Sequence, residues 1–133
     1  MFLRSTALAD TEISEANFPD NAFRNTVKVF DTDGDGILSD AEIAGVKEID
    51  CQFLGIESLK GIEVFTALED LNCEMNELKK LDLRHNPRLK KLSCGYNTAL
   101  SSLNLVAQTE LRILNSYKTL FLAAGAPETA AFK

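Results

Sequence analysis

The feature that most constrains this chain is a leucine-based repeat between residues 68 and 115. Successive blocks begin at Leu68, Leu78, Leu89, Leu100 and Leu111, so they recur at a nearly constant step. The first four blocks follow the pattern L-x-x-L-x-(L/C)-x-x-(N/Q), with cysteine and leucine alternating at the sixth position, and the block at Leu111 begins with the same L-x-x-L. The structural unit is therefore a pair of blocks, with equivalent starts at Leu68, Leu89 and Leu111. Similar units that follow one another in this way stack and bury a continuous core.

A weaker copy of the unit precedes these blocks, over residues 46–67. In it Cys51 matches Cys73, and Cys94 follows in the next unit, so the three cysteines of the chain occupy one position of the repeat. We expect them to be reduced and stacked in the core, because an unpaired cysteine packs as a small apolar residue. A metal-binding triad is the alternative.

The apolar residues inside each block alternate with polar ones, which predicts a short strand with alternate side chains inward. Amide side chains follow at the turn: Asn76, Asn86, Asn97 and, in the next block, Gln108. Such a side chain can bond the buried backbone of a tight bend. No block has room for a long helix, so the second half of each unit is expected to return as another extended segment.

This pattern resembles the leucine-rich repeat. It is more closely similar to the nested 21-residue form common in bacterial surface proteins, in which an LxxLxCxxN half alternates with an LxxLDLxxN half. The stretch SLKGIE at residues 58–63 looks like the first repeat of internalin-type arrays. The resemblance implies a secreted or cell-surface bacterial protein whose repeats recognise or adhere to a protein or glycan ligand.

A second motif, DTDGDGILSDAE, runs from Asp31 to Glu42 and matches the EF-hand pattern D-x-[DN]-x-[DN]-G-x5-E at every position. Its predicted metal ligands are the carboxylates of Asp31, Asp33, Asp35 and Glu42, the backbone carbonyl of Ile37 and, through a water, Ser39. Hard oxygen ligands on a flexible loop favour Ca²⁺ over Mg²⁺. The alternative is an acidic turn that binds no ion.

Helices are expected on both sides of this loop. Phe23, Val27 and Phe30 have the spacing of one helical face, which predicts a helix over about residues 20–30. Pro19 is expected in its first turn. The stretch DAEIAGVKEI predicts a second helix that ends near Gly45.

Only one such loop is present, and no linker separates it from the first repeat at Val46. A solenoid leaves the apolar core of its terminal repeat open to water. We expect Phe18, Phe23, Phe30 and Ile43 to cover that end, with calcium holding the two helices at a fixed angle. The alternative function is a calcium sensor or buffer.

The predicted fold is therefore α+β, with an N-terminal helix–loop–helix EF-hand packed on a short leucine-rich-repeat solenoid. Its parts are a flexible N-terminus over residues 1–15, the cap over 16–45, the repeats over 46–117 and a closing segment and tail over 118–133. In the last part we expect Leu120, Phe121 and Leu122 to close the final repeat, and the residues after Gly125 to be disordered.

Charge and composition exclude several partners. The formal net charge of −6 argues against nucleic-acid binding and against adsorption to anionic lipid. No apolar run approaches the roughly 20 residues of a membrane-spanning helix, so no membrane insertion is expected. The triplet Ala7-Leu8-Ala9 resembles a signal cleavage site after too short an apolar region, so either a signal has been shortened or the match is accidental.

No catalytic constellation is recognisable, so an enzyme is not expected. The only histidine, His85, is expected to be a solvated turn residue rather than a catalytic base. Polar residues beside the inward leucines are candidate ligand faces, along one ladder Asp70, Asn72, Glu74, Ser93 and Tyr96, and along the other Lys80, Asp82 and Arg84. Polar strand faces are also needed for solubility, so the evidence for a ligand there is weak.

Overall fold

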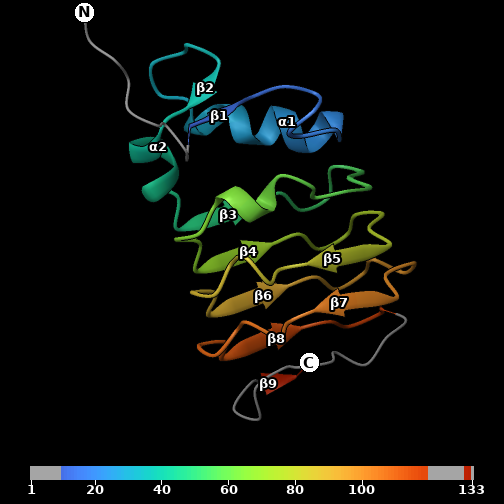
Figure 1. The fold of residues 1–133 in the computed structure, drawn as a ribbon. Helices are drawn as coiled ribbons and strands as arrows, with labels where there is room; N and C mark the ends of the chain where they lie inside the picture. The colour runs from blue at the N-terminus through green and yellow to red at the C-terminus, as the bar shows by residue number, and fades with distance from the viewer. Residues whose placement is uncertain (1–9, 120–130, 133) are drawn as a thin grey trace, which may run out of the picture.

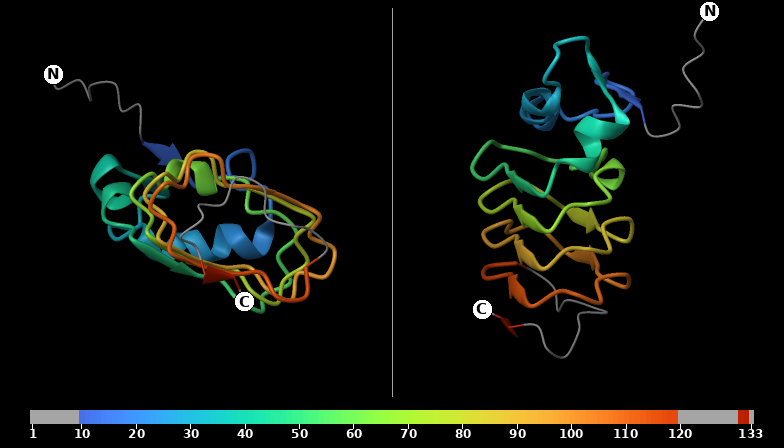
Figure 2. Two further views of the ribbon diagram at one scale, coloured as in Figure 1. Left: turned by 90° about the horizontal axis from the view of Figure 1, so that it is seen from below. Right: turned by 90° about the vertical axis from the view of Figure 1, so that its left-hand side faces the viewer.

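A stack of chain turns forms the body of the molecule (Figure 1). The computed structural model describes residues 10–119 and 131–132. Each turn contributes short strands that pair in parallel with the equivalent strands of neighbouring turns. Viewed along the axis, the turns superpose into one oval outline, and α1 (Asn21–Val27) lies across one end of it (Figure 2). The predicted solenoid is confirmed.

The larger sheet has five strands in the order β3-β4-β6-β8-β9. Their bounds are Glu48–Asp50 for β3, Asp70–Asn72 for β4, Lys91–Ser93 for β6, Ile113–Asn115 for β8 and Ala131–Phe132 for β9. Register places Ile49 beside Leu71, Leu71 beside Leu92, and Leu92 beside Leu114, and all four side chains are buried. The alternation of inward and outward residues thus follows the predicted strand pattern.

A second, two-stranded parallel sheet is formed by β5 (Lys80–Asp82) and β7 (Ser102–Asn104). This sheet confirms the prediction that the second half of a unit runs back as another extended segment. The second half of the first unit differs, because it contains the short 3-10 helix η2 (Ile62–Val64).

Buried amides fasten the turns to one another, as predicted. Asn76 Nδ2 donates to the carbonyls of Cys51 at 2.9 Å and Cys73 at 3.1 Å, while its Oδ1 accepts from the backbone N–H groups of Leu54 and Ile56, both at 3.0 Å. Asn86, Asn97 and Gln108 are also buried, and each donates to carbonyls contributed by neighbouring turns. An amide can therefore satisfy backbone groups on two turns at once.

The N-terminal part contains α1, the 3-10 helix η1 (Lys28–Phe30), strand β2 (Ile37–Leu38) and helix α2 (Asp40–Ala44). The predicted helix over 20–30 is thus an α-helix followed by a 3-10 turn, and the second helix ends before Gly45 as expected. Pro19 precedes the helix, because Asp20 is the N-cap residue. None of the helices in the described ranges is long and apolar enough to cross a membrane.

Part of the segment predicted to be a flexible N-terminus takes part in a small sheet, and its flexibility stays a prediction. Strand β1 (Thr11–Glu12) pairs antiparallel with β2, and the Ile13 N–H donates to the Gly36 carbonyl at 2.9 Å. The reason is tertiary: β2 is an unpaired strand until another segment of the chain bonds to it. Residues 1–9 lie outside the described residues.

Aromatic side chains join this part to the first repeat. The ring of Phe65 in the first unit lies 6.4 Å from the ring of Phe18 and 5.7 Å from that of Phe30. Phe18, Phe23 and Ile43 are buried in the same core as the repeat leucines, and Phe30 packs against it. The predicted apolar covering of the first repeat is therefore present.

Asp20 links the same two parts through its carboxylate. One oxygen caps α1 by accepting from the Phe23 N–H at 3.0 Å, and the other accepts from the backbone N–H groups of Glu57 at 2.8 Å and Ser58 at 3.3 Å. A single side chain thus satisfies a helix end and a loop of the first unit.

The predicted closing residues Leu120, Phe121 and Leu122 lie outside the described residues. At the far end β9 pairs with β8 in parallel and extends the larger sheet. The exposed edge of β8 offers the backbone groups that this short strand bonds. The expected disorder after Gly125 concerns residues that lie mostly outside the described ranges, and it stays a prediction.

Candidate metal centre

Three carboxylates converge in the loop between α1 and α2. Asp31, Asp33 and Asp35 each offer an oxygen, and these oxygens lie within 4.8 Å of one another. Asp31 organises the loop, since its Oδ2 accepts from the Gly36 N–H at 2.9 Å and its Oδ1 from the Gly34 N–H at 3.0 Å. Gly34 and Gly36 have φ values of +71° and +81°, which glycine adopts at low cost. Local sequence alone thus builds the cluster.

Hydrogen bonds inside the loop perturb these acids. The pKa of Asp33 is raised, chiefly by its side-chain hydrogen bond with Asp31 and to a smaller extent by desolvation and by Asp35. The pKa of Asp31 is lowered, chiefly because the Gly36 N–H stabilises its charged form. A bound cation would favour the charged form of all three acids.

The other predicted ligands take part in hydrogen bonds or secondary structure of the same segment. The Glu42 carboxylate accepts from the Thr32 N–H at 2.6 Å and hydroxyl at 3.0 Å, and from the Ser39 N–H at 2.8 Å. These hydrogen bonds, chiefly the one from the Ser39 N–H, lower the pKa of Glu42 to about 2. Ser39 caps α2 by accepting from the Glu42 N–H, and Ile37 lies in β2 beside Glu12. The structure therefore shows the carboxylates of Asp31, Asp33 and Asp35 clustered, while the roles of Ile37, Ser39 and Glu42 as ligands stay predictions.

The three cysteines form a buried column, as predicted. Cys51, Cys73 and Cys94 are unpaired, and none of their side chains is accessible to solvent. Burial raises the pKa of the Cys51 and Cys94 thiols to about 12, and that of Cys73 well above its ordinary value. Among the described residues, the aspartate cluster is the only group of three acidic, histidine or cysteine side chains close enough to hold a metal, so the packing interpretation of the cysteines holds.

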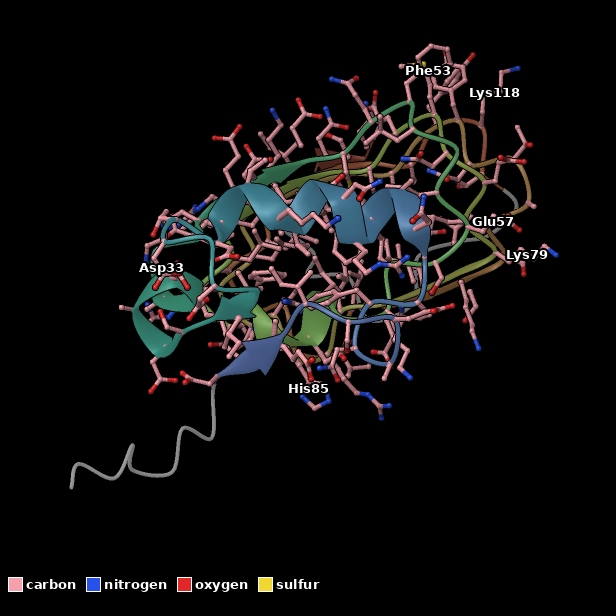
Figure 3. The ribbon with its side chains drawn as sticks, turned by 90° about the horizontal axis from the view of Figure 1, so that it is seen from above. Asp33, Phe53, Glu57, Lys79, His85 and Lys118 are labelled. Carbon is pink, nitrogen blue, oxygen red and sulfur yellow. The ribbon has the colours of Figure 1, made fainter. Side chains whose placement is uncertain are left out.

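The two candidate ligand faces differ from the prediction in one respect. Ser93 is buried at 7% exposure and cannot belong to a surface. Asp82 forms an ion pair with Arg84 at 3.0 Å on the other face. His85 is exposed in a turn, as expected, on the side of the solenoid away from Phe53 (Figure 3).

Exposed apolar residues in the turns after the larger sheet were not singled out by the sequence reasoning. Phe53, Met75 and Tyr117 are 77%, 40% and 52% exposed, beside the predicted Tyr96. The signal was available: in the units that contain cysteine, the residue two positions after it is Phe, Met or Tyr. This recurrence of large apolar residues is less regular than the leucine pattern, which dominates the sequence.

The repeat, the amide contacts and the cysteine column together define an internalin-like leucine-rich-repeat solenoid. No protein-family model matches the chain. Internalin J of Listeria monocytogenes serotype 4b is 33% identical over 70 residues, which are 52% of this chain and 8% of that protein. The chain therefore spans a small part of the curated relative that it matches.

Two solved structures share the fold. A functional domain of InlJ from Listeria monocytogenes, described as including a cysteine ladder, superposes with a TM-score of 0.63 at 23% identity, covering 84% of this chain and 29% of that one. The internalin InlF of strain 4b F2365 superposes with a TM-score of 0.51 at 18% identity, covering 90% of this chain and 49% of that one. At these identities the likeness concerns the fold.

Proposed function

We propose that this chain is a calcium-stabilised leucine-rich-repeat module of a secreted or surface bacterial protein, and that it recognises a protein or glycan ligand. The observation that carries the calcium part is the convergence of Asp31, Asp33 and Asp35 in a loop whose flanking helices cover the first repeat. The recognition part draws support from the exposed solenoid surface and from the likeness to internalin J.

The donor set fits a hard divalent cation. Carboxylate oxygens within 4.8 Å of one another match the ligand chemistry of Ca²⁺, which takes six to eight oxygens in a flexible geometry. Asp31, Asp33 and Asp35 would hold the ion, and Glu42, Ser39 and the Ile37 carbonyl would complete its shell. Glu42 already contacts Thr32 inside the loop, so it is near enough to exchange those hydrogen bonds for the ion.

Bound calcium would act as a structural staple in this proposal. The loop connects α1, which carries Phe23 and Val27 into the core, with α2, which carries Ile43. An ion that fixes both ends of the loop would hold both helices against the first repeat. Such an ion stabilises the folded state because the unfolded chain does not bind it well.

Isothermal titration of chelator-treated protein tests the proposal. We expect one site that prefers Ca²⁺ over Mg²⁺, and much weaker binding for Asp33→Asn and Glu42→Gln. Asp40→Asn is the matched control, because it removes an exposed carboxylate of the same segment that is outside the proposed shell. A flat titration of the wild-type protein would contradict the calcium part.

A calcium sensor would give a different signature. A sensor exposes an apolar groove when it binds calcium, so the signal of a hydrophobic dye should rise. The staple keeps its apolar side chains in one core with the repeat, and predicts no such rise. A stable apo form together with a calcium-dependent dye signal would favour the sensor.

A further inference from the structure

Four residues in equivalent turns share an unusual backbone conformation. Phe53, Met75, Tyr96 and Lys118 have φ values of 57°, 54°, 58° and 63°, and in the described residues no other non-glycine residue has a positive φ. The backbone N–H of each of the first three donates to a carbonyl of the following turn, at 2.7 to 3.0 Å. We name this stack the exposed ladder; Phe53 and Lys118, from opposite ends of it, lie at one corner of the solenoid (Figure 3).

The turn geometry does not account for the side chains found there. Glycine adopts a left-handed conformation at low cost, whereas a bulky residue is strained in it. The turns after β5 and β7, at Arg84–His85 and Val106–Ala107, are made without any left-handed residue. Strained residues that persist cluster at binding sites. The ladder keeps Phe53 at 77%, Met75 at 40% and Tyr96 at 47% exposure despite the strain.

The ring of Tyr96 in the ladder and that of Tyr117, the residue before Lys118, form an aromatic cluster that holds a cation. Tyr96 and Tyr117 meet edge to face, with ring centroids 5.6 Å apart at 67°. Lys118 Nζ lies 5.4 Å from the centroid of the Tyr117 ring, so a cation already occupies one ring of the cluster. The more exposed ring of Phe53 has no aromatic or cationic partner among the described contacts.

Carboxylates flank the end of the ladder nearest the N-terminal part. Asp50 precedes Phe53 by three residues in the sequence, and Glu74 and Glu77 stand on either side of Met75, whereas Glu57 lies away from Phe53 (Figure 3). The side chains of Asp50 and Glu77 are exposed, and Glu74 is half-buried. Aromatic rings beside carboxylates attract arginine and lysine side chains by cation–π contact and by charge.

We infer that the exposed ladder binds an extended, arginine- or lysine-containing segment of a partner protein. The inference deepens the proposed recognition function and rests on it. The segment lies along the solenoid axis, its cationic side chains contacting the rings of Phe53 and Tyr96 and the carboxylates of Asp50, Glu74 and Glu77. The periodic spacing of the turns suits an extended chain, whose side chains also recur at a fixed interval.

Other occupants fit less well. A second copy of the chain would bring the same carboxylates together, in a protein whose net charge is −6. A glycan site needs polar groups aimed at sugar hydroxyls, and the amides beside the ladder are already used. Asn115 Nδ2 donates to Glu74 Oε1 at 2.9 Å, and Gln52 Nε2 donates to Asp50 Oδ2 at 3.2 Å.

Intrinsic tyrosine fluorescence gives a readout confined to this site. The chain has two tyrosines and no tryptophan: Tyr96 belongs to the ladder, and Tyr117 packs against Tyr96. The probe is the capped octapeptide acetyl-(Arg-Ser)4-amide, which carries no fluorophore of its own. We expect a saturable change in tyrosine emission that weakens as salt is added, and no change with acetyl-(Glu-Ser)4-amide.

The variant Phe53→Gly combined with Met75→Gly separates binding from folding. It removes the side chains and relieves the backbone strain, so we expect affinity for the arginine peptide to fall at least tenfold while the melting temperature does not fall. Val106→Ser is the matched control, since Val106 is 69% exposed in a turn of the other sheet. It should bind as the wild type does.

Several results would overturn the inference. They are the absence of a saturable response at millimolar peptide, equal binding of the glutamate peptide, and wild-type affinity in the double glycine variant. Self-association that the double variant abolishes would assign the ladder to a second copy, and a response to maltohexaose alone would assign it to a glycan. Peptide binding depends on the solenoid and not on the acidic loop. A failed calcium titration would therefore contradict the calcium part of the proposed function without changing how the peptide result is interpreted.

Discussion

Replacement of Gly61 by alanine tests how the N-terminal part is seated on the first repeat. Gly61 has a φ of +108°, and a Cβ atom built there would lie 2.2 Å from Phe18 Cδ1 and 2.8 Å from the Asn17 carbonyl. No L side chain fits without moving the ring of Phe18, which is fully buried. The substitution therefore combines backbone strain with overpacking.

The magnitude follows from those two contributions. A side chain held in a left-handed conformation costs about 1–2 kcal/mol, and overpacking a well-packed core costs about 1–3 kcal/mol more. We expect the free energy of unfolding to fall by about 2–5 kcal/mol, a large share of the ~5–15 kcal/mol of a typical domain. Gly55→Ala is the matched control, because Gly55 has a φ of +68° but its Cβ would meet only Glu77 Oε2, at 3.5 Å. The Gly55→Ala substitution should lower the free energy of unfolding by the backbone-strain contribution alone.

Equilibrium unfolding in urea measures both variants, and a double-mutant cycle with Phe18→Ala isolates the clash. In the Phe18→Ala background Gly61→Ala should cost less than in the wild type but still more than Gly55→Ala, because the Asn17 carbonyl remains 2.8 Å from the added Cβ. A coupling energy near zero, or equal destabilisation by the two glycine substitutions, would show that Phe18 does not occupy this place against the first repeat.

Further perturbations test the other contacts. If Ca²⁺ is present at about a hundredfold above its Kd, its removal should lower stability by roughly 2.7 kcal/mol and speed hydrogen exchange over residues 23–62 more than around Leu92, by mass spectrometry. Without calcium, stability should fall as pH drops from 4.5 through about 2, because the folded-state pKa of Glu42 is depressed; Glu42→Gln should flatten that part of the profile. The three cysteine thiols should resist alkylation in the native state and react after denaturation. Folding raises the pKa of Cys51 and Cys94 from 9.0 to about 12, so the free energy of unfolding should fall as pH rises across that interval. Asn76→Ala should cost at least about 2 kcal/mol in urea unfolding, since it leaves buried backbone groups on two turns without partners.

The sequence by itself determined the features that depend on short, repeated spacing. The nearly constant step from Leu68 to Leu89 to Leu111 fixes which side chains are stacked, because every turn must place its backbone groups opposite those of the next. For that reason the inward leucines, the cysteine column and the amide of Asn76 were all predictable. The cluster of Asp31, Asp33 and Asp35 was predictable too, since the glycines that bend the loop lie inside the same motif.

Only the tertiary structure decided the features that join segments distant in the chain. Nothing near Thr11 in the sequence indicates that it pairs with β2, and nothing near Asp20 indicates that its second oxygen reaches the loop at Glu57. The Glu42 carboxylate, expected at the ion, bonds Thr32 and Ser39 because those donors lie within reach in the folded loop. The exposed ladder belongs to the same group: its residues are separated by whole repeats, and stacking of the turns brings them to one corner of the solenoid.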